Sequence, residues 1–172
     1  MTAPRPPVLV AKYTPRAQAA RLGRRVAYYT WREGEDRPRQ HPRVWHAHDG
    51  RELDYAAARA EIATAAREAT LTYRVVLSPG DGEGLLPEDY AAVLGRHFDR
   101  WYVVAHHFGD HPHAHALAPA HRRLDRDALA DLRAALGERT RERGRERWRD
   151  AESLTPARVP RAAERTQELE LW

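Results

Sequence analysis

The chain has 172 residues, 42% of them hydrophobic, which is enough for one domain with a buried core and excludes disorder throughout. It has no cysteine, which excludes disulfides, thiolate catalysis and iron–sulfur clusters. It also has no apolar run long enough to span a bilayer and no export signal, so we expect a cytoplasmic protein with no membrane partner. The basic residues number 29 against 25 acidic ones, and the isoelectric point is about 9.7.

The interleaving of predicted helices and strands indicates an α+β or α/β fold with a sheet core. Strands are predicted where β-branched residues alternate, and helices where Ala- and Arg-rich runs follow a capping residue or a proline. In chain order we predict a strand over 8–12, a helix over 16–32, a hairpin over 44–53 that turns at Asp49-Gly50, a helix over 54–69 capped by Asp54, a strand over 71–77, a helix over 87–98, strands over 101–107 and 113–118, and helices over 125–136 and 138–150.

The positive charge is almost entirely guanidinium, because Lys12 is the only lysine. A planar guanidinium suits bidentate phosphate recognition, although a GC-rich genome would produce the same composition. The sequence around Lys12, LVAKYT, cannot supply the Gly-rich loop of a P-loop nucleotide site. ATPase and helicase motors are therefore excluded.

Five of the ten histidines lie in the segment AHHFGDHPHAHAL. His113 and His115 are two residues apart, so a strand places both imidazoles on one face. His106 or His107, at the end of the preceding strand, completes a group of three if the two strands pair as a hairpin. Three neutral imidazoles leave coordination positions open for water or substrate oxygen. We therefore predict a metal site; the alternative is a solvated histidine-rich turn.

Three segments together resemble the relaxases of plasmid mobilisation, which belong to the HUH endonucleases. They are the histidine block HHFGDHPHAH over residues 106–115, the preceding LTYRVVLSPGDGEG, and RRVAYYTWREG further upstream. Their order and spacing agree over residues 8–120. The resemblance implies an HUH-relaxase-like α+β fold, in which helices flank a central antiparallel sheet. It also implies a divalent ion (Mg²⁺ or Mn²⁺) with His106, His113 and His115 as its ligands, and His107 as a rival for the first position.

One position departs from the family's pattern. Relaxases usually carry an acid two residues after the first histidine, and this acid orients a ligand imidazole. Here the position is Phe108. Asp110 and Asp99 are the candidates to replace it, and a degenerate, non-catalytic relaxase scaffold is an open alternative.

The resemblance also implies a tyrosine nucleophile. Matching the family's tyrosine segment to the Arg32-Glu33-Gly34 ending selects Tyr29, and Tyr28 is the first alternative, ahead of Tyr13. A phosphotyrosyl diester preserves the energy of the cleaved bond, so the strand can be rejoined.

The arginines and tryptophans near these tyrosines are candidate DNA contacts. Arg24, Arg25 and Arg32 flank the tyrosine pair and are predicted to hold phosphates. Trp31 and Trp45 are candidates for stacking on bases or, equally, for packing. The Arg- and Glu-rich helix over 138–150 is interpreted as a solvated helix laced with ion pairs.

Taken together, the resemblance predicts a relaxase-like nuclease domain over residues 1–150 and a peripheral C-terminal helix or tail over 151–172. The implied partners are single-stranded or locally melted DNA at an origin of transfer and accessory relaxosome proteins. The alternatives are a rolling-circle replication initiator, a non-catalytic DNA-binding protein, and a metal hydrolase that uses water in place of tyrosine.

Overall fold

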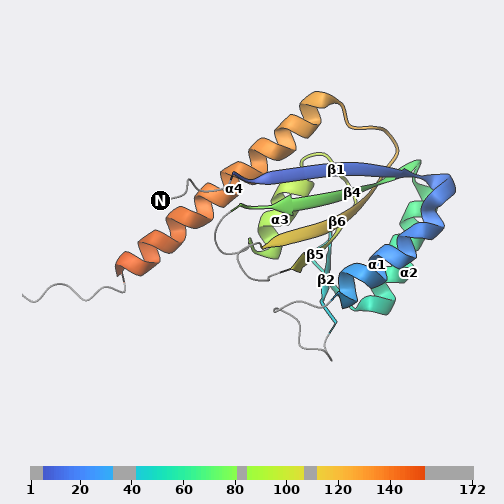
Figure 1. Cartoon of the computed structure of the whole chain (residues 1–172), viewed down its shortest axis with the longest axis horizontal. Helices are drawn as coiled ribbons and strands as arrows, with labels where there is room; N and C mark the ends of the chain where they lie inside the picture. The colour runs from blue at the N-terminus through green and yellow to red at the C-terminus, as the bar shows by residue number, and fades with distance from the viewer. Residues whose placement is uncertain (1–5, 33–41, 81–84, 107–111, 154–172) are drawn as a thin grey trace, which may run out of the picture.

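The computed structural model describes residues 6–32, 42–80, 85–106 and 112–153, and side chains as far as residue 147. Its centre is a six-stranded antiparallel sheet with the order β1-β4-β6-β5-β2-β3 (Figure 1). The strands are β1 (Val8–Pro15), β2 (Trp45–Ala47), β3 (Glu52–Leu53), β4 (Leu71–Ser78), β5 (Tyr102–His106) and β6 (His113–Ala120). The predicted α+β fold with a central antiparallel sheet is therefore confirmed at this level.

Helices cover both faces of the sheet. They are η1, a 3₁₀ helix (Arg16–Arg21), and the α-helices α1 (Leu22–Trp31), α2 (Tyr55–Glu68), α3 (Pro87–Leu94) and α4 (Arg126–Ser153). Because side chains alternate along a strand, the sheet contributes to two cores. One core packs β1 and the central strands against α3 and α4, and the other packs α1 and α2 against β2, β5 and β6.

The short hairpin and the helix that follows it form where the sequence predicts them. Gly50 adopts a positive φ of 84° in the turn between β2 and β3, a conformation that glycine adopts at no steric cost. Asp54 caps α2, because its carboxylate accepts a hydrogen bond from the backbone N–H of Ala57 at 2.8 Å. Both signals are local, so they act in the same way in any fold.

Four predicted helices differ from the observed ones. The helix predicted over 16–32 is divided into η1 and α1. The helix predicted to reach residue 98 ends at Leu94, which lets Phe98 turn into the core. The two helices predicted over 125–150 are one continuous helix, α4, because Gly137 adopts helical geometry and does not terminate it.

Helix α4 continues beyond the sheet, as Figure 1 shows. It passes through the predicted domain boundary at residue 150, and residues 154–172 lie outside the described part of the chain. None of the described helices is both long enough and apolar enough to cross a membrane.

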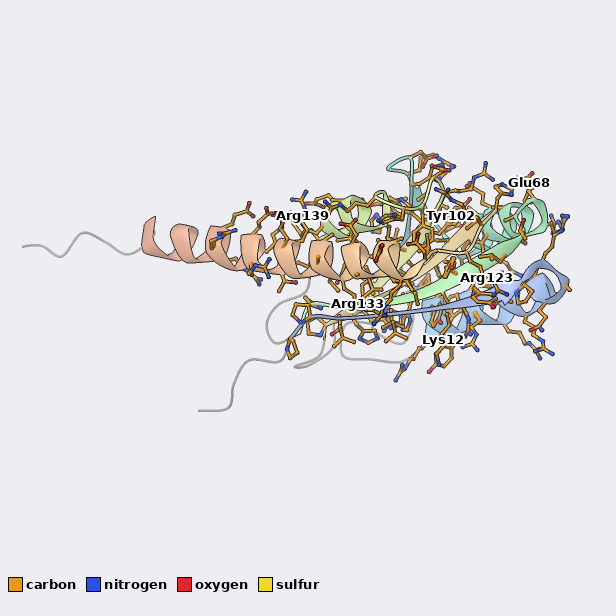
Figure 2. The ribbon with its side chains drawn as sticks, turned by 90° about the horizontal axis from the view of Figure 1, so that it is seen from above. Lys12, Glu68, Tyr102, Arg123, Arg133 and Arg139 are labelled. Atoms are coloured by element: carbon orange, nitrogen blue, oxygen red, sulfur yellow. The ribbon has the colours of Figure 1, made fainter. Side chains whose placement is uncertain are left out.

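An arginine attaches α4 to the start of α3. The guanidinium of Arg143 contacts Asp89 at 2.7 Å, Glu88 at 3.0 Å and, within α4, Glu146 at 3.0 Å. Asp89 is buried, and its carboxylate also accepts the backbone N–H of Leu86, which caps α3. Arg139 pairs with Glu142 on the exposed side of α4, so the predicted ion pairs of this helix are present (Figure 2).

We predict that Arg143→Gln lowers the free energy of unfolding by about 1–3 kcal/mol, because it leaves the buried carboxylate of Asp89 without its cationic partner. Arg139→Gln removes the same charge from an exposed pair and should cost less than about 0.5 kcal/mol. Urea unfolding of both variants and the wild type makes the comparison. Equal effects of the two substitutions would contradict a special role for the α3–α4 junction.

Candidate metal centre

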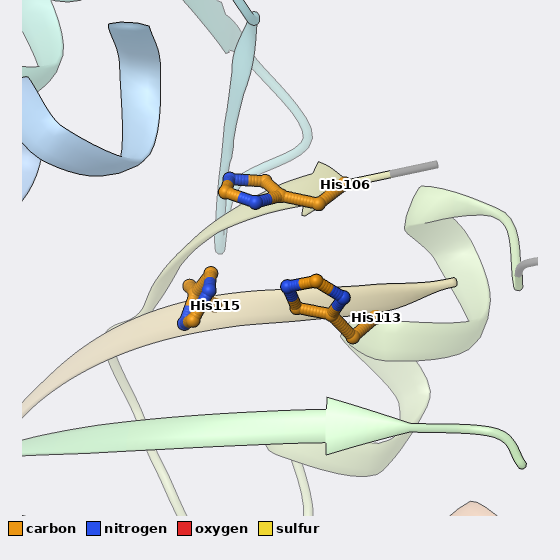
Figure 3. Close-up of side chains that lie close together, drawn as sticks. All are labelled: His106, His113 and His115. Carbon is orange, nitrogen blue, oxygen red and sulfur yellow. The ribbon is translucent and has the colours of Figure 1, made fainter. Parts of the chain in front are cut away.

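The hairpin of β5 and β6 brings three histidines together on one face of the sheet. His106 on β5 lies directly opposite His113 on β6, and His115 is two residues further along the same face of β6. One ring nitrogen from each of the three lies within 4.8 Å of the other two. Figure 3 shows the three rings grouped at this end of the two strands. His106 therefore occupies the first position of the predicted group, and its rival His107 lies outside the described residues.

Burial keeps His115 neutral. Only 9% of the residue is exposed, and burial is the main reason that its pKa is lowered from 6.5 to about 3. Repulsion from the charges of Arg32 and Arg43, and from His106 and His113 when these are protonated, lowers the pKa of His115 further. Both ring nitrogens of His115 are buried and have no hydrogen-bond partner in the described part of the chain. A buried, neutral imidazole of this kind has a lone pair available to a cation.

A backbone carbonyl orients His106. Its Nε2 lies 2.9 Å from the carbonyl oxygen of Tyr29 in α1. A carbonyl can only accept a hydrogen bond, so Nε2 carries the proton and Nδ1 has the lone pair. The bond fixes the orientation of the imidazole.

The proposed substitutes for that acid are not seen in this role. Asp99 precedes β5, and His106 is the last residue of that strand, so the length of β5 separates the two. Phe108 and Asp110 lie outside the described residues.

Tyr29 packs directly on the histidines. Its ring stacks on His115 with 4.0 Å between the ring centroids and 10° between the planes. Tyr29 is only 6% exposed, whereas Tyr28 is 52% exposed and has the guanidinium of Arg32 5.6 Å from its ring centre. The two tyrosine rings meet edge to face, 5.8 Å apart. Helix α1 thus places one tyrosine against the histidines and its neighbour in solvent.

Tyr13 is separated from the histidines by the sheet itself. Its ring meets Tyr73, which belongs to the core under α3 and α4 on the opposite face. Of the three candidate tyrosines, the structure therefore brings Tyr29 into contact with the histidines and keeps Tyr28 beside it.

Arg43 is a residue of this site that sequence analysis missed. It is 7% exposed and donates hydrogen bonds to the carbonyls of Arg32 at 2.6 Å and Tyr29 at 3.4 Å. The last carbonyls of a helix carry partial negative charge, so a guanidinium there stabilises the end of α1. No local pattern marks Arg43, because its partners precede it by 11 and 14 residues.

The remaining predicted contacts divide between surface and core. Arg24 and Arg25 on α1 and Arg32, which follows its last residue, are exposed. Trp31 is partly exposed and meets Tyr55 edge to face. Trp45 is wholly buried, and its Nε1 donates to Thr30 Oγ1 at 2.8 Å. The suggestion that Trp45 stacks on bases is therefore wrong, because packing against α1 covers its ring.

Comparison of the chain with protein-family models, with curated proteins and with solved structures finds no match. The argument for a functional site therefore depends on the geometry of these residues.

The donor set fits a transition-metal ion. Three imidazoles converge, at least two of them with a lone pair defined by burial or by hydrogen bonding. Imidazole nitrogen suits Mn²⁺ and the later first-row ions, whereas Mg²⁺ prefers oxygen ligands. Of the two expected ions, Mn²⁺ fits these residues better.

We predict that the protein binds Mn²⁺ more tightly than Mg²⁺ and that His113→Asn or His115→Asn weakens Mn²⁺ binding by about 100-fold or more, because each removes one nitrogen ligand. Titration calorimetry measures this directly. His48→Asn is the matched control, since His48 is exposed in the turn after β2. Unchanged Mn²⁺ affinity in both site variants would refute the centre.

The lowered pKa of His115 predicts a pH-dependent stability of the metal-free protein. The unfolded chain protonates this imidazole near pH 6.5, whereas the folded chain resists protonation down to about pH 3. The unfolded state therefore binds more protons in this range, and the free energy of unfolding should fall as the pH falls from 6.5, by at most about 1.4 kcal/mol per pH unit from this group.

Urea unfolding in chelator at several pH values tests this expectation. In His115→Asn the free energy of unfolding should fall less steeply with falling pH, because the unfolded chain has one imidazole fewer to protonate. His48→Asn should keep the wild-type dependence on pH. A wild-type slope in His115→Asn would show that the buried imidazole does not resist protonation.

Proposed function

We propose that the protein is a metal-dependent DNA strand transferase of the relaxase type, which nicks single-stranded or locally melted origin-of-transfer DNA through a 5′-phosphotyrosyl intermediate. The observation that carries the proposal is the stacking of Tyr29 on His115 within a group of three convergent histidines. A strand-transfer site needs a nucleophile beside a charge-neutralising centre, and helix α1 supplies a tyrosine at that place.

His106, His113 and His115 would hold the divalent ion, which when bound would polarise the scissile phosphate and neutralise charge on its oxygens. The tyrosine oxygen attacks phosphorus, and the bond from phosphorus to the 3′ oxygen breaks. The phenol loses its proton in this step, and the leaving oxygen takes one up to become a 3′-hydroxyl. The 5′ phosphate stays on the tyrosine, and the reverse attack by the 3′-hydroxyl rejoins the strand.

Tyr29 is the proposed nucleophile because it contacts a ligand histidine. Tyr28 is the alternative, because its greater exposure would admit a polymeric substrate more readily. Arg24 and Arg25 on the same helix and Arg32 directly after it are exposed, and we propose that they hold phosphates beside the scissile bond. Accessory relaxosome proteins are the partners that this function implies.

We predict that labelled single-stranded DNA and Mn²⁺ yield a covalent protein–DNA adduct that migrates slowly on a denaturing gel. Tyr29→Phe should abolish the adduct while leaving Mn²⁺ affinity unchanged and costing at most about 1 kcal/mol of stability, because only one hydroxyl is lost. Tyr28→Phe, which changes the neighbouring ring in the same way, is the matched control. Mass spectrometry of the DNA-linked peptide identifies the attachment residue.

Each other outcome points to a different function. If Tyr28→Phe alone removes the adduct, Tyr28 is the nucleophile. Cleavage that survives without an adduct in the variant that carries both Tyr28→Phe and Tyr29→Phe would indicate a metal hydrolase. DNA binding without cleavage would indicate a non-catalytic protein on this scaffold. A replication initiator would form the same adduct and would be distinguished by cleavage at a replication origin.

A further inference from the structure

Half of one sheet face is left uncovered by the helices. The core under α1 and α2 takes its strand residues from β2, β3, β5 and β6, and it includes none from β1 or β4. Of the β1 and β4 side chains that point to this side, Thr72 is buried, whereas Val8, Val10 and Lys12 are exposed and Arg74 and Val76 are half-buried. Val8 and Val10 are 49% and 42% exposed there. We refer to the residues Val8, Val10, Lys12, Arg74 and Val76 as the β1–β4 face.

Two cations lie directly opposite each other on this face. Lys12 on β1 pairs in register with Arg74 on β4. Like charges at opposed positions of an antiparallel pair repel each other and destabilise the sheet. Figure 2 shows Lys12 standing clear of β1 on the side turned away from α4. The repulsion is therefore a cost that an anionic ligand could remove.

No carboxylate offsets this pair within the described residues. Neither Lys12 nor Arg74 makes an ion pair there, and the Nε atom of Arg74 is buried without a hydrogen-bond partner. Strands β1, β4 and β6 contain no acidic residue, and the first 32 residues of the chain carry seven basic residues and no acidic one. A guanidinium donor buried without a partner is costly, so its geometry points to a ligand that accepts hydrogen bonds.

The cation pair lies beside the histidines. In the sheet register Arg74 is opposite Leu117, and His115 is two residues from Leu117 on the same strand. Arg74 and His115 are therefore diagonal neighbours on one face, which places their Cβ atoms about 7–8 Å apart. Two residues further along β4, Val76 lies between Val10 on β1 and His115 on β6, so apolar side chains lead up to the imidazole. Positive and apolar side chains thus form one continuous surface that leads away from the histidine group.

We propose that the β1–β4 face binds the sugar–phosphate backbone of a single-stranded nucleic acid, with Lys12 and Arg74 holding one phosphate diagonal to His115. The need for a polyanion follows from the charges of the face, whereas the identity of the strand as DNA rests on the proposed function. The exposed valines favour a single strand, because its unstacked bases and sugars offer apolar surface that a duplex hides.

The test measures binding of the full-length protein to a fluorescent single-stranded DNA in chelator, so that neither metal nor cleavage contributes. Lys12→Gln and Arg74→Gln should each weaken binding about tenfold at low salt, because each removes a charged contact to phosphate. Each should also reduce the slope of log affinity against log salt by about 0.7. Arg133→Gln is the matched control, because it removes one exposed charge from α4 on the opposite side of the sheet (Figure 2).

A charge reversal separates binding from folding. Lys12→Glu places a carboxylate opposite Arg74 and should raise the melting temperature by about 2 °C, because attraction replaces repulsion. The same substitution should weaken DNA binding more than Lys12→Gln does. A variant that is more stable and binds more weakly cannot have lost binding through misfolding, so it also covers the case in which Arg74→Gln fails to fold.

The results distinguish this proposal from the proposed function. If binding depends on Lys12 and Arg74 but no covalent adduct forms, the result supports DNA binding by the β1–β4 face and contradicts the proposed strand-transfer function. If the adduct forms but the variants of Lys12 and Arg74 bind DNA as tightly as Arg133→Gln does, the proposed role of the β1–β4 face is overturned. The proposed function would then stand. Equal affinity for a blunt duplex of the same sequence overturns the single-strand assignment.

Discussion

The main-chain carbonyl of Tyr29 connects the parts of this site. It accepts the Nε2–H of His106 on β5 and a guanidinium hydrogen of Arg43, so both lone pairs of one oxygen are engaged. The same residue stacks its ring on His115. Moving the end of α1 would therefore disturb the orientation of two of the three histidines. The position of the candidate nucleophile and the orientation of the candidate metal ligand His106 depend on the same residue of α1.

The sheet register determines what lies around this centre. Antiparallel pairing sets His106 opposite His113, and the two-residue repeat adds His115 on the same face. The same register sets Lys12 opposite Arg74 in a neighbouring row. A slip of one residue would turn all of these side chains to the core under α3 and α4, where imidazoles and charges would be buried among apolar residues. The hydrophobic pattern of the strands thus maintains the candidate site.

Burial and positive charge act together at the histidines. Both keep His115 neutral, with its pKa lowered to about 3, and a neutral imidazole binds cations. The surroundings of the centre are themselves rich in arginine, and Arg32 and Arg43 are close enough to influence His115. Such surroundings favour an anionic partner, since a polyanion would relieve repulsion that the protein alone does not. The candidate metal centre and the proposed β1–β4 face are consistent with a single phosphate-rich ligand.

The sequence by itself determined the features that local rules govern. The alternation of His113 and His115, the Asp49-Gly50 turn and the Asp54 cap each depend on neighbours only a few residues away, and each was predicted. Only the tertiary structure decided which groups meet across the fold: His106 with the carbonyl of Tyr29, Arg43 with the end of α1, and Lys12 with Arg74. These contacts join residues from 11 to 77 positions apart, and no periodicity records them, because they arise from strand order and helix packing.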